Sequence, residues 1–148
     1  EGLMTTIREN ILDELKSVLT GTTNVGARIF RERVTPLANR NELPCLVIEP
    51  LNDNADLNLS LPKIDWTLTV TISVIVSGSS STTPSEAADP IVESLHAKVV
   101  SDLTLGGYAI DVRPQSMEWE FLDSDQPTGI VTCTYAIRYR TSLTSLAS

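Results

Sequence analysis

The sequence predicts an α+β fold, in which an antiparallel or mixed β-sheet carries two helices packed on one face. Three observations lead to this fold class: one long run of alternating apolar and polar residues, two segments with an apolar stripe at helical spacing, and a strand hairpin towards the end of the chain. Each helix has a single stripe and the strands are mostly apolar on one side, so helices and sheet bury these surfaces best against each other. We expect one such domain over residues 4–141.

The segment Lys63–Val76 is the strand around which the rest of the chain is organised. Side chains alternate between the two faces of a strand, and the polar face here consists mostly of Asp, Thr and Ser. The apolar face consists of Ile64, Trp66, Leu68, Val70, Ile72, Val74 and Val76. At roughly 3.3 Å per residue the run measures about 45 Å, whereas a domain of this size has a radius of gyration of about 15 Å. The strand is therefore expected to cross the domain and to project from it.

The first helix is predicted directly after Thr6. Thr6 can cap this helix while Glu9, three residues later, reaches back to form a capping box. Gly21 ends the helix, as glycine commonly does where the chain turns left-handed. The apolar stripe consists of Ile7, Ile11, Leu12, Leu15, Val18 and Leu19.

The second helix is predicted after a Ser-rich loop at residues 77–82. Thr83, Pro84 and Glu86 are the residue types expected at the N-cap, the first turn and the third position of a helix. Pro90 lies inside the apolar pattern and cannot donate a hydrogen bond to the preceding turn. We therefore expect either a kink at Pro90 or a helix that begins near it.

Shorter strands are predicted on both sides of the long strand. The last two should pair as an antiparallel hairpin across the turn at 123–129, which is rich in turn-forming residues. Pro50 is expected to end the second strand, and residues 51–61 to form a polar connection. The predicted strands are Ala27–Arg31, Leu43–Glu49, Tyr108–Val112, Met117–Leu122 and Ile130–Arg140.

Three segments are expected to lie outside this regular structure. Residues 33–42 mix charge, proline and asparagine without periodicity, and a loop of that length is functional or mobile more often than average. Residues 142–148 are expected to be a frayed tail. Residues 1–3, which precede a methionine, are either native sequence or a remnant introduced by cloning.

Composition narrows the possible functions. The chain of 148 residues has an apolar fraction of 41%, a formal net charge of −8 and a sequence pI near 4.5, which argues against a free-standing nucleic-acid binder. No apolar run approaches the roughly 20 residues that a membrane helix needs, and the start of the sequence lacks the pattern of a signal peptide. We therefore expect neither specific nucleic-acid binding nor a membrane anchor.

The arginines cluster despite the negative net charge. This cluster fits a solvated loop and strand end, a basic patch for an acidic protein partner or, least of the three, phosphate contact. The clustered residues are Arg28, Arg31, Arg33, Arg40, Arg138 and Arg140.

No catalytic pattern is present in the sequence. His96 is the only histidine and has no Cys or Asp at ligand spacing, so no metal site is expected. Cys45 and Cys133 lie in apolar strand patterns and are expected to be buried free thiols. Glu118 and Glu120 share one strand face, about 7 Å apart by strand geometry, and fit a solubilising surface better than a glycosidase pair. We therefore expect a structural or binding protein without cofactors rather than an enzyme.

The order of elements and two local stretches resemble the tail terminator proteins of long-tailed bacteriophages, the minor tail protein U-like group. The stretches are 27–37, A-R-I-F-R-E-R-V-T-P-L, and 42–49, E-L-P-C-L-V-I-E. In this family a short strand with a basic end leads into a loop, and an E-L-P sequence opens the next strand. The resemblance covers nearly the whole chain, but its motifs are not chemically diagnostic.

The resemblance implies an α+β subunit that forms a hexameric ring and has no enzymatic activity. Such a ring caps the tail tube at its full length, stops tube elongation and provides the surface for head joining. The implied partners are copies of the chain itself, the tail tube protein and a head-completion protein. The implied location is the virion tail, assembled in the cytoplasm of the bacterial host.

The resemblance does not identify the contact residues, so they are predicted from the residue types. Loops 77–83 and 123–129 are further candidates for contact, and carboxylates lining the opening would repel DNA phosphates as they pass. For the subunit or tube interface we expect Arg31, Arg33, Thr35, Arg40, Thr69 and Thr71. For the lumen we expect Asp53, Asp56, Asp123 and Asp125.

Two other classes of function fit the same sequence. One is another phage or prophage structural protein, such as a head–tail connector or a tube-like subunit. The other, less favoured, is a small-ligand-binding domain with a site that carries no sequence motif. Oligomeric state distinguishes these classes best, because a six-fold ring fits the first and the terminator but not a lone binding domain.

Overall fold

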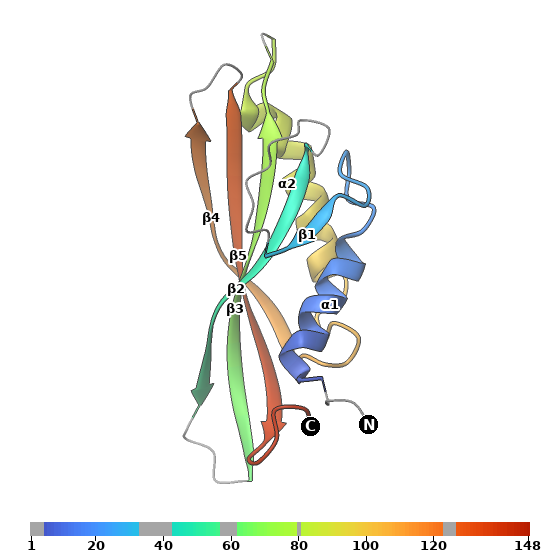
Figure 1. Ribbon diagram of the computed structural model, residues 1–148, viewed down its shortest axis with the longest axis vertical. Helices are drawn as coiled ribbons and strands as arrows, with labels where there is room; N and C mark the ends of the chain where they lie inside the picture. The colour runs from blue at the N-terminus through green and yellow to red at the C-terminus, as the bar shows by residue number, and fades with distance from the viewer. Residues whose placement is uncertain (1–4, 33–42, 57–61, 80, 123–126) are drawn as a thin grey trace.

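The computed structural model contains one five-stranded mixed sheet with two α-helices, which confirms the predicted α+β class (Figure 1). It describes residues 5–32, 43–56, 62–79, 81–122 and 127–148. The helices are α1 (Ile7–Leu19) and α2 (Pro84–Val100). The strands are β1 (Ile29–Arg31), β2 (Cys45–Asp56), β3 (Lys63–Ser77), β4 (Asp111–Leu122) and β5 (Thr128–Ser142).

The sheet has the strand order β1-β2-β3-β5-β4, so the predicted long strand β3 lies at its centre. β1 pairs with β2 in parallel, and all other pairs are antiparallel. β3 and β5 form an unbroken ladder from Lys63↔Ser142 to Ser77↔Thr128. β4 and β5 form the predicted hairpin.

Both helices lie on the same side of the sheet, and the core fills the space between them (Figure 1). Alternate residues of β3 and β5 face this core, as the sequence pattern predicts. The core residues of β3 are Leu68, Val70, Ile72, Val74 and Val76, and those of β5 are Val131, Cys133, Tyr135, Ile137 and Tyr139. The helices contribute Ile11, Leu12, Leu15, Leu19, Ala88, Ile91, Leu95 and Val99.

The predicted helix caps form, with one difference at α1. Thr6 accepts a hydrogen bond from the backbone N–H of Glu9, but the Glu9 carboxylate turns away towards Arg31 instead of completing a capping box. Thr83 and Glu86 form both halves of the capping box at α2. α2 then runs through Pro90 without a new start.

The start of α2 packs closely against β5 at Gly129. A Cβ atom on Gly129 would lie only 2.6 Å from the Cβ of Pro84. A side chain at this position would push the helix off the sheet, so the close approach requires glycine.

Three strands continue past the N-terminal end of α1 and form a sheet extension, which we define as Asn52–Asp56, Lys63–Thr67 and Arg138–Ser142 (Figure 1). β1 pairs only with Leu46–Ile48, and β4 begins opposite Arg138, the first residue of the β5 part, so neither outer strand accompanies the rest of the extension. The expectation that the long strand projects is therefore met, and two more strands project with it.

Two predicted strand boundaries were wrong. Pro50 does not end β2: a bulge at Leu51 interrupts the register, and pairing resumes at Asn52↔Thr69 and runs to Asp56↔Asp65. The two strands predicted at 108–112 and 117–122 are one strand, β4, with a bulge between Pro114 and Ser116. Proline fits there because β4 is an edge strand, where a missing N–H breaks no ladder bond.

The end of the chain is held in place, contrary to the predicted frayed tail. β5 extends to Ser142, and the N–H of Leu143 donates to the carbonyl of Pro62. The carbonyl of Leu146 accepts a hydrogen bond of 2.9 Å from the N–H of Ile7. The tail thus satisfies one of the free N–H groups in the first turn of α1.

Candidate interaction surfaces

The sheet face opposite the helices is a surface of small polar side chains. β3 and β5 place threonine and serine side by side there, with Thr71 opposite Thr134 and Ser73 opposite Thr132. Most of these side chains are half-buried by their neighbours, and Thr71 is 9% exposed. We call this surface the threonine face. It carries hydroxyl groups and few charges, whereas a solvent-exposed sheet face is usually charged. The threonine face therefore suits contact with another protein surface.

The threonine face ends in a charged cluster on the sheet extension. Arg140 Nε donates to Asp65 Oδ1 at 2.6 Å, and Arg138 Nη2 lies 3.8 Å from Asp65 Oδ2. The hydrogen bond from Arg140 lowers the pKa of the Asp65 carboxyl below its usual value. Asp65 is 7% exposed, whereas both guanidinium groups remain about half exposed. Two arginines share one buried carboxylate, so this part of the surface keeps a positive charge.

A second cluster joins the helix side of the extension to α1. Tyr139 donates a hydrogen bond from its hydroxyl group to Asp53 Oδ2, and Arg8 Nε lies 3.4 Å from the same oxygen. The Arg8 guanidinium lies 5.3 Å from the centre of the Trp66 ring, and Trp66 stacks on Tyr139. Burial raises the pKa of the Asp53 carboxyl, and this effect outweighs the opposing contributions of Tyr139 and Arg8. The other carboxylate oxygen, Oδ1, is buried and has no hydrogen-bond partner among the described residues.

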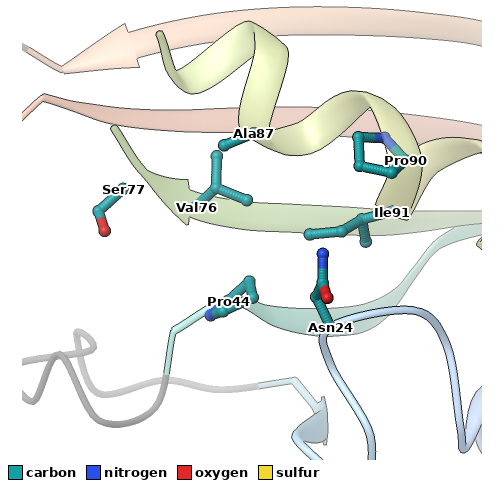
Figure 2. A pocket seen from close by; sticks show the side chains of 7 residues that line it. All are labelled: Asn24, Pro44, Val76, Ser77, Ala87, Pro90 and Ile91. Carbon is teal, nitrogen blue, oxygen red and sulfur yellow. The ribbon is translucent and has the colours of Figure 1, made fainter. Parts of the chain in front are cut away.

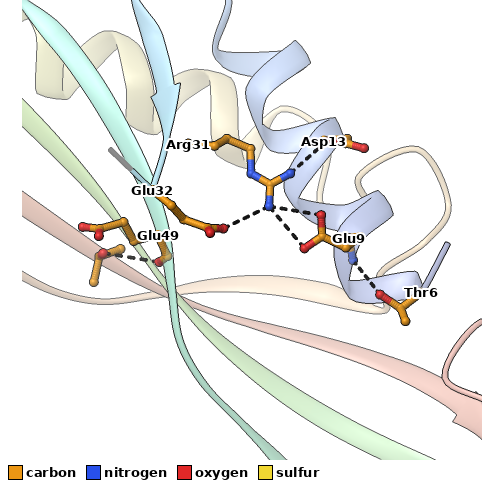
Figure 3. A network of polar contacts seen from close by, with 7 residues as sticks. Thr6, Glu9, Asp13, Arg31, Glu32 and Glu49 are labelled. Carbon is orange, nitrogen blue, oxygen red and sulfur yellow. Dashed lines mark hydrogen bonds and ion pairs between the residues drawn. The ribbon is translucent and has the colours of Figure 1, made fainter. Parts of the chain in front are cut away.

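Arg31 holds β1 against α1 (Figure 3). Its guanidinium group donates to Asp13 at 3.0 Å, and to Glu9 and Glu32 at 3.2 Å each. The side chain is 20% exposed. Burial, the largest single effect, lowers the pKa of Arg31, but Glu9 and Glu32 together outweigh it, so the pKa is raised. The positive charge of Arg31 is therefore used within the subunit.

The strand β4 presents an apolar edge. Met117, Trp119 and Phe121 lie on its helix side, but only Met117 is partly covered by α2. Trp119 is 53% exposed and Phe121 is 57% exposed. No described strand pairs with the outer side of β4. Exposed aromatic side chains on an unpaired strand edge are typical of a surface that another chain covers.

A pocket of about 320 Å³ opens near the start of α2 (Figure 2). Its lining is mainly apolar, with the Asn24 amide and the Ser77 hydroxyl as the polar groups. None of the described lining residues is ionisable, and the pocket offers space for a small apolar group. The lining residues are Asn24, Pro44, Val76, Ser77, Ala87, Pro90 and Ile91.

The ionisable residues singled out in the sequence have structural partners. His96 Nδ1 lies 2.9 Å from the hydroxyl oxygen of Tyr135, which is buried. Both cysteines are buried and neither is in a disulfide, and burial raises the pKa of the Cys133 thiol to about 11. Within the described ranges, no three His, Cys, Asp or Glu side chains are placed to hold a metal ion. Neither helix is long and apolar enough to cross a membrane, over the residues searched.

The predicted contact residues fall into three groups. Thr69 and Thr71 lie on the threonine face, and Asp56 is exposed at the end of the sheet extension. Arg31 and Asp53 are engaged within the subunit, so neither presents a free charge to a partner or a lumen. Arg33, Thr35, Arg40, Asp123 and Asp125 lie outside the described residues.

Sequence reasoning missed the cluster around Asp65. The residues Asp65, Arg138 and Arg140 all fall in the polar phase of their strands, which was visible in the sequence. Their contact depends on the register of β3 against β5, which brings residue 65 opposite residue 140. Residues 65 and 140 are 75 positions apart in the sequence, and the register that pairs them follows from tertiary packing rather than from local pattern.

Comparison with known proteins does not assign this chain to a family. No model of a known protein family matches the sequence, and no curated protein is similar to it.

Proposed function

We propose that the chain is a ring-forming structural subunit of a phage tail, in the role of a tail terminator. In that role it caps the tail tube, stops its elongation and provides the surface for head joining. The sheet extension is the observation that carries the proposal. Three strands continue past the N-terminal end of α1, and because β1 and β4 do not accompany them, two strand edges are exposed there. A projecting sheet with open edges is well suited to contact between subunits.

The surfaces of the subunit support an assembly role. The threonine face and the β4 edge lie on different sides of the sheet, so one subunit offers more than one contact region. We propose a hexamer as the oligomer, with the tail tube protein and a head-completion protein as further partners. The implied location is the virion tail, after assembly in the host cytoplasm. The resemblance of residues 27–37 and 42–49 to the terminator family points to the same role.

We also propose that the lumen of this ring is acidic. Asp56, which is exposed, and the carboxylates of residues 123–125 are the candidates. The Asp53 carboxylate is not among them, because it bonds to Tyr139 and Arg8. An acidic lumen repels phosphate and lets DNA pass without binding. Tight binding of duplex DNA to the assembled protein at low salt would contradict this part of the proposal.

Purified tail tubes provide the test of the terminator role. We expect the protein to bind at one end of each tube, as seen by electron microscopy, and to stop further addition of tube subunits. Decoration along the whole tube, or growth of the protein into tubes, would instead indicate a tube-like subunit. A protein that stays monomeric and leaves tube growth unchanged would contradict the proposal.

The pocket in Figure 2 favours a second candidate function, the binding of a small ligand. Its volume is at the lower end of the range for ligand pockets, roughly 300–1,000 Å³. Narrowing the pocket by Ala87→Leu distinguishes the two functions. This change should leave tube capping unaffected if the chain is a terminator.

A further inference from the structure

We propose that subunits join through their sheets, with the β2 edge of one copy pairing antiparallel with the β4 edge of the next. The edges are Leu51–Asp56 and Ser116–Phe121. This contact would join neighbouring subunits of the proposed ring, so it rests on the proposed function.

Both segments are strand edges without a described neighbour on their outer side. β1 covers β2 only at Leu46–Ile48, and no described strand covers the outer edge of Leu51–Ala55. β4 is the last strand of the sheet at the other side. An open edge exposes a row of N–H and C=O groups that can pair with another strand. Each edge also carries large exposed apolar side chains, with Leu51 62% and Phe121 57% exposed.

Electrostatics argues against the pairing of β4 with the β4 of a second copy. Glu118 and Glu120 lie on the threonine-face side of β4, opposite Thr132 and Ile130 of β5. Antiparallel pairing of two β4 edges would bring these glutamates close to their own counterparts, and like charges in facing positions are destabilising. The partner strand must therefore offer neutral or basic residues at the matching positions.

The β2 edge offers neutral residues at those positions. Asn52 and Asn54 lie on the threonine-face side, opposite Thr69 and Thr67 of β3, and their side chains hydrogen-bond to each other at 3.0 Å. An antiparallel register that places Asn54 opposite Glu118 also places Asn52 opposite Glu120. Each amide can then donate a hydrogen bond to a carboxylate.

The same register also brings apolar residues together. It places Leu51, which lies in the bulge of β2, opposite Phe121, and Ala55 opposite Met117 on the helix side. Asp53, which is bonded to Tyr139, lies opposite Trp119. Asp56 then lies opposite Ser116, and no two carboxylates face each other across the contact. Antiparallel strands of this kind gain from such facing pairs as well as from their backbone hydrogen bonds.

The position of the two edges favours a closed ring. They lie on opposite sides of one sheet, so each copy offers one edge to each neighbour, and such contacts repeat into a ring or an open chain. Across the sheet, Asn54 lies opposite Thr67 of β3, and Thr67 lies opposite Arg138 of β5. Glu118 lies opposite Thr132, which is six residues from Arg138 along β5. Each subunit therefore shifts the contact by six residues along the strands, which is about 20 Å. Across the strands, each subunit adds four strands, which is about 19 Å. The strands would then incline by about 45° to the ring axis, close to the tilt of strands in closed β-barrels.

Charge reversal at the two edges tests the contact. We expect the wild-type protein to form a defined oligomer by light scattering and native mass measurement. The double variant N52E/N54E places glutamate against glutamate and should weaken the contact by at least about tenfold. Adding E118K/E120K to that variant should restore assembly, because each pair then has opposite charges. The control S85E/A97E adds two acids at exposed positions of α2 and should assemble normally.

Cysteine cross-linking tests the register. A mixture of N54C and E118C proteins should form a disulfide-linked pair on oxidation, whereas a mixture of N54C and R113C should not. Circular dichroism and urea unfolding check that each variant folds.

Two results would overturn the inference: a wild-type protein that stays monomeric at the highest concentration it tolerates, or an N52E/N54E variant that assembles as well as wild type. If that variant assembles and also caps tubes, the edge contact fails while the terminator role stands. If the edge contact is found but tubes are not capped, the terminator role fails while the contact stands.

Discussion

The helix-covered half of the sheet and the sheet extension use the same three strands in different ways. In the covered half, apolar side chains of β3 and β5 meet α2 and are fully buried. In the extension, the same strands are fixed by polar groups: Asp65 between two arginines on one side, and Asp53 between Tyr139 and Arg8 on the other. Continuous strands thus pass from a region held by packing to one held by charge and hydrogen bonds.

The largest difference between the two regions should appear on truncation of a leucine. Leu95 on α2 is 0% exposed, and Leu95→Ala should reduce the free energy of unfolding by about 2–5 kcal/mol, because it leaves a cavity in the core. Leu51→Ala at the extension should change it by less than about 0.5 kcal/mol. Urea unfolding measures both. Equal losses would show that the extension is packed as tightly as the core.

Removing the Tyr139 hydroxyl group should have the next largest effect. Tyr139→Phe leaves the poorly exposed Asp53 carboxylate with Arg8 as its described partner, and should cost about 1–3 kcal/mol. The matched control is Tyr108→Phe, because Tyr108 is 41% exposed and should tolerate the change. If both variants unfold at the same urea concentration, the Tyr139–Asp53 hydrogen bond does not stabilise the extension.

The two carboxylates of the extension should respond to pH in opposite directions. The folded-state pKa of Asp65 is lowered, so its stabilisation is present above the unfolded value near 3.8 and is lost as the pH falls through the folded pKa. The folded-state pKa of Asp53 is raised, so its contribution is present below the unfolded value and is lost as the pH rises through the folded pKa.

Unfolding of D65N and D53N between neutral and acid pH measures this difference. The stability advantage of wild type over D65N should shrink as the pH falls, and its value at neutral pH should be about 1 kcal/mol. The advantage of wild type over D53N should grow as the pH falls. Parallel pH profiles for the two variants would contradict the assigned environments.

A small, salt-dependent effect is expected at Arg31. Arg31→Ala removes three ion pairs that join β1 to α1 and should cost about 1 kcal/mol at low salt, less at high salt. Arg113→Ala serves as the control, because Arg113 is 76% exposed and pairs only with Asp111 among the described residues. A loss at Arg31 that does not depend on salt would indicate packing of its aliphatic part instead.

Local patterns predicted most of the covered half. The caps at Thr6 and Thr83, the helix stripes and the alternation of β3 all depend on residues that are neighbours in sequence, and the structure confirms each. The extension was predicted only through β3. Residues 52–56 of β2 lack a strand pattern of their own and are held extended by pairing with β3. This is a tertiary effect that propensity does not capture.

The predicted contact residues likewise divide into those that local pattern places and those whose partners are distant in sequence. Thr69 and Thr71 were placed correctly on one face, because alternation alone determines the face of a residue in a known strand. Arg31 was predicted at the subunit or tube interface and Asp53 in the lumen, whereas in the structure each has a charged partner on α1, which is distant in sequence. Exposure of a charged residue depends on such partners, and sequence composition does not reveal them.

The unbroken ladder between β3 and β5 has a mechanical consequence. Fifteen residues of each strand pair without a bulge, whereas β2 and β4 each contain one. A force along these two strands in opposite directions loads all of their cross-strand hydrogen bonds at once, in shear, so that they must fail together. The central pair is therefore the stiffest and strongest part of the subunit, and under tension the bulges at Leu51 and Gln115 should yield first.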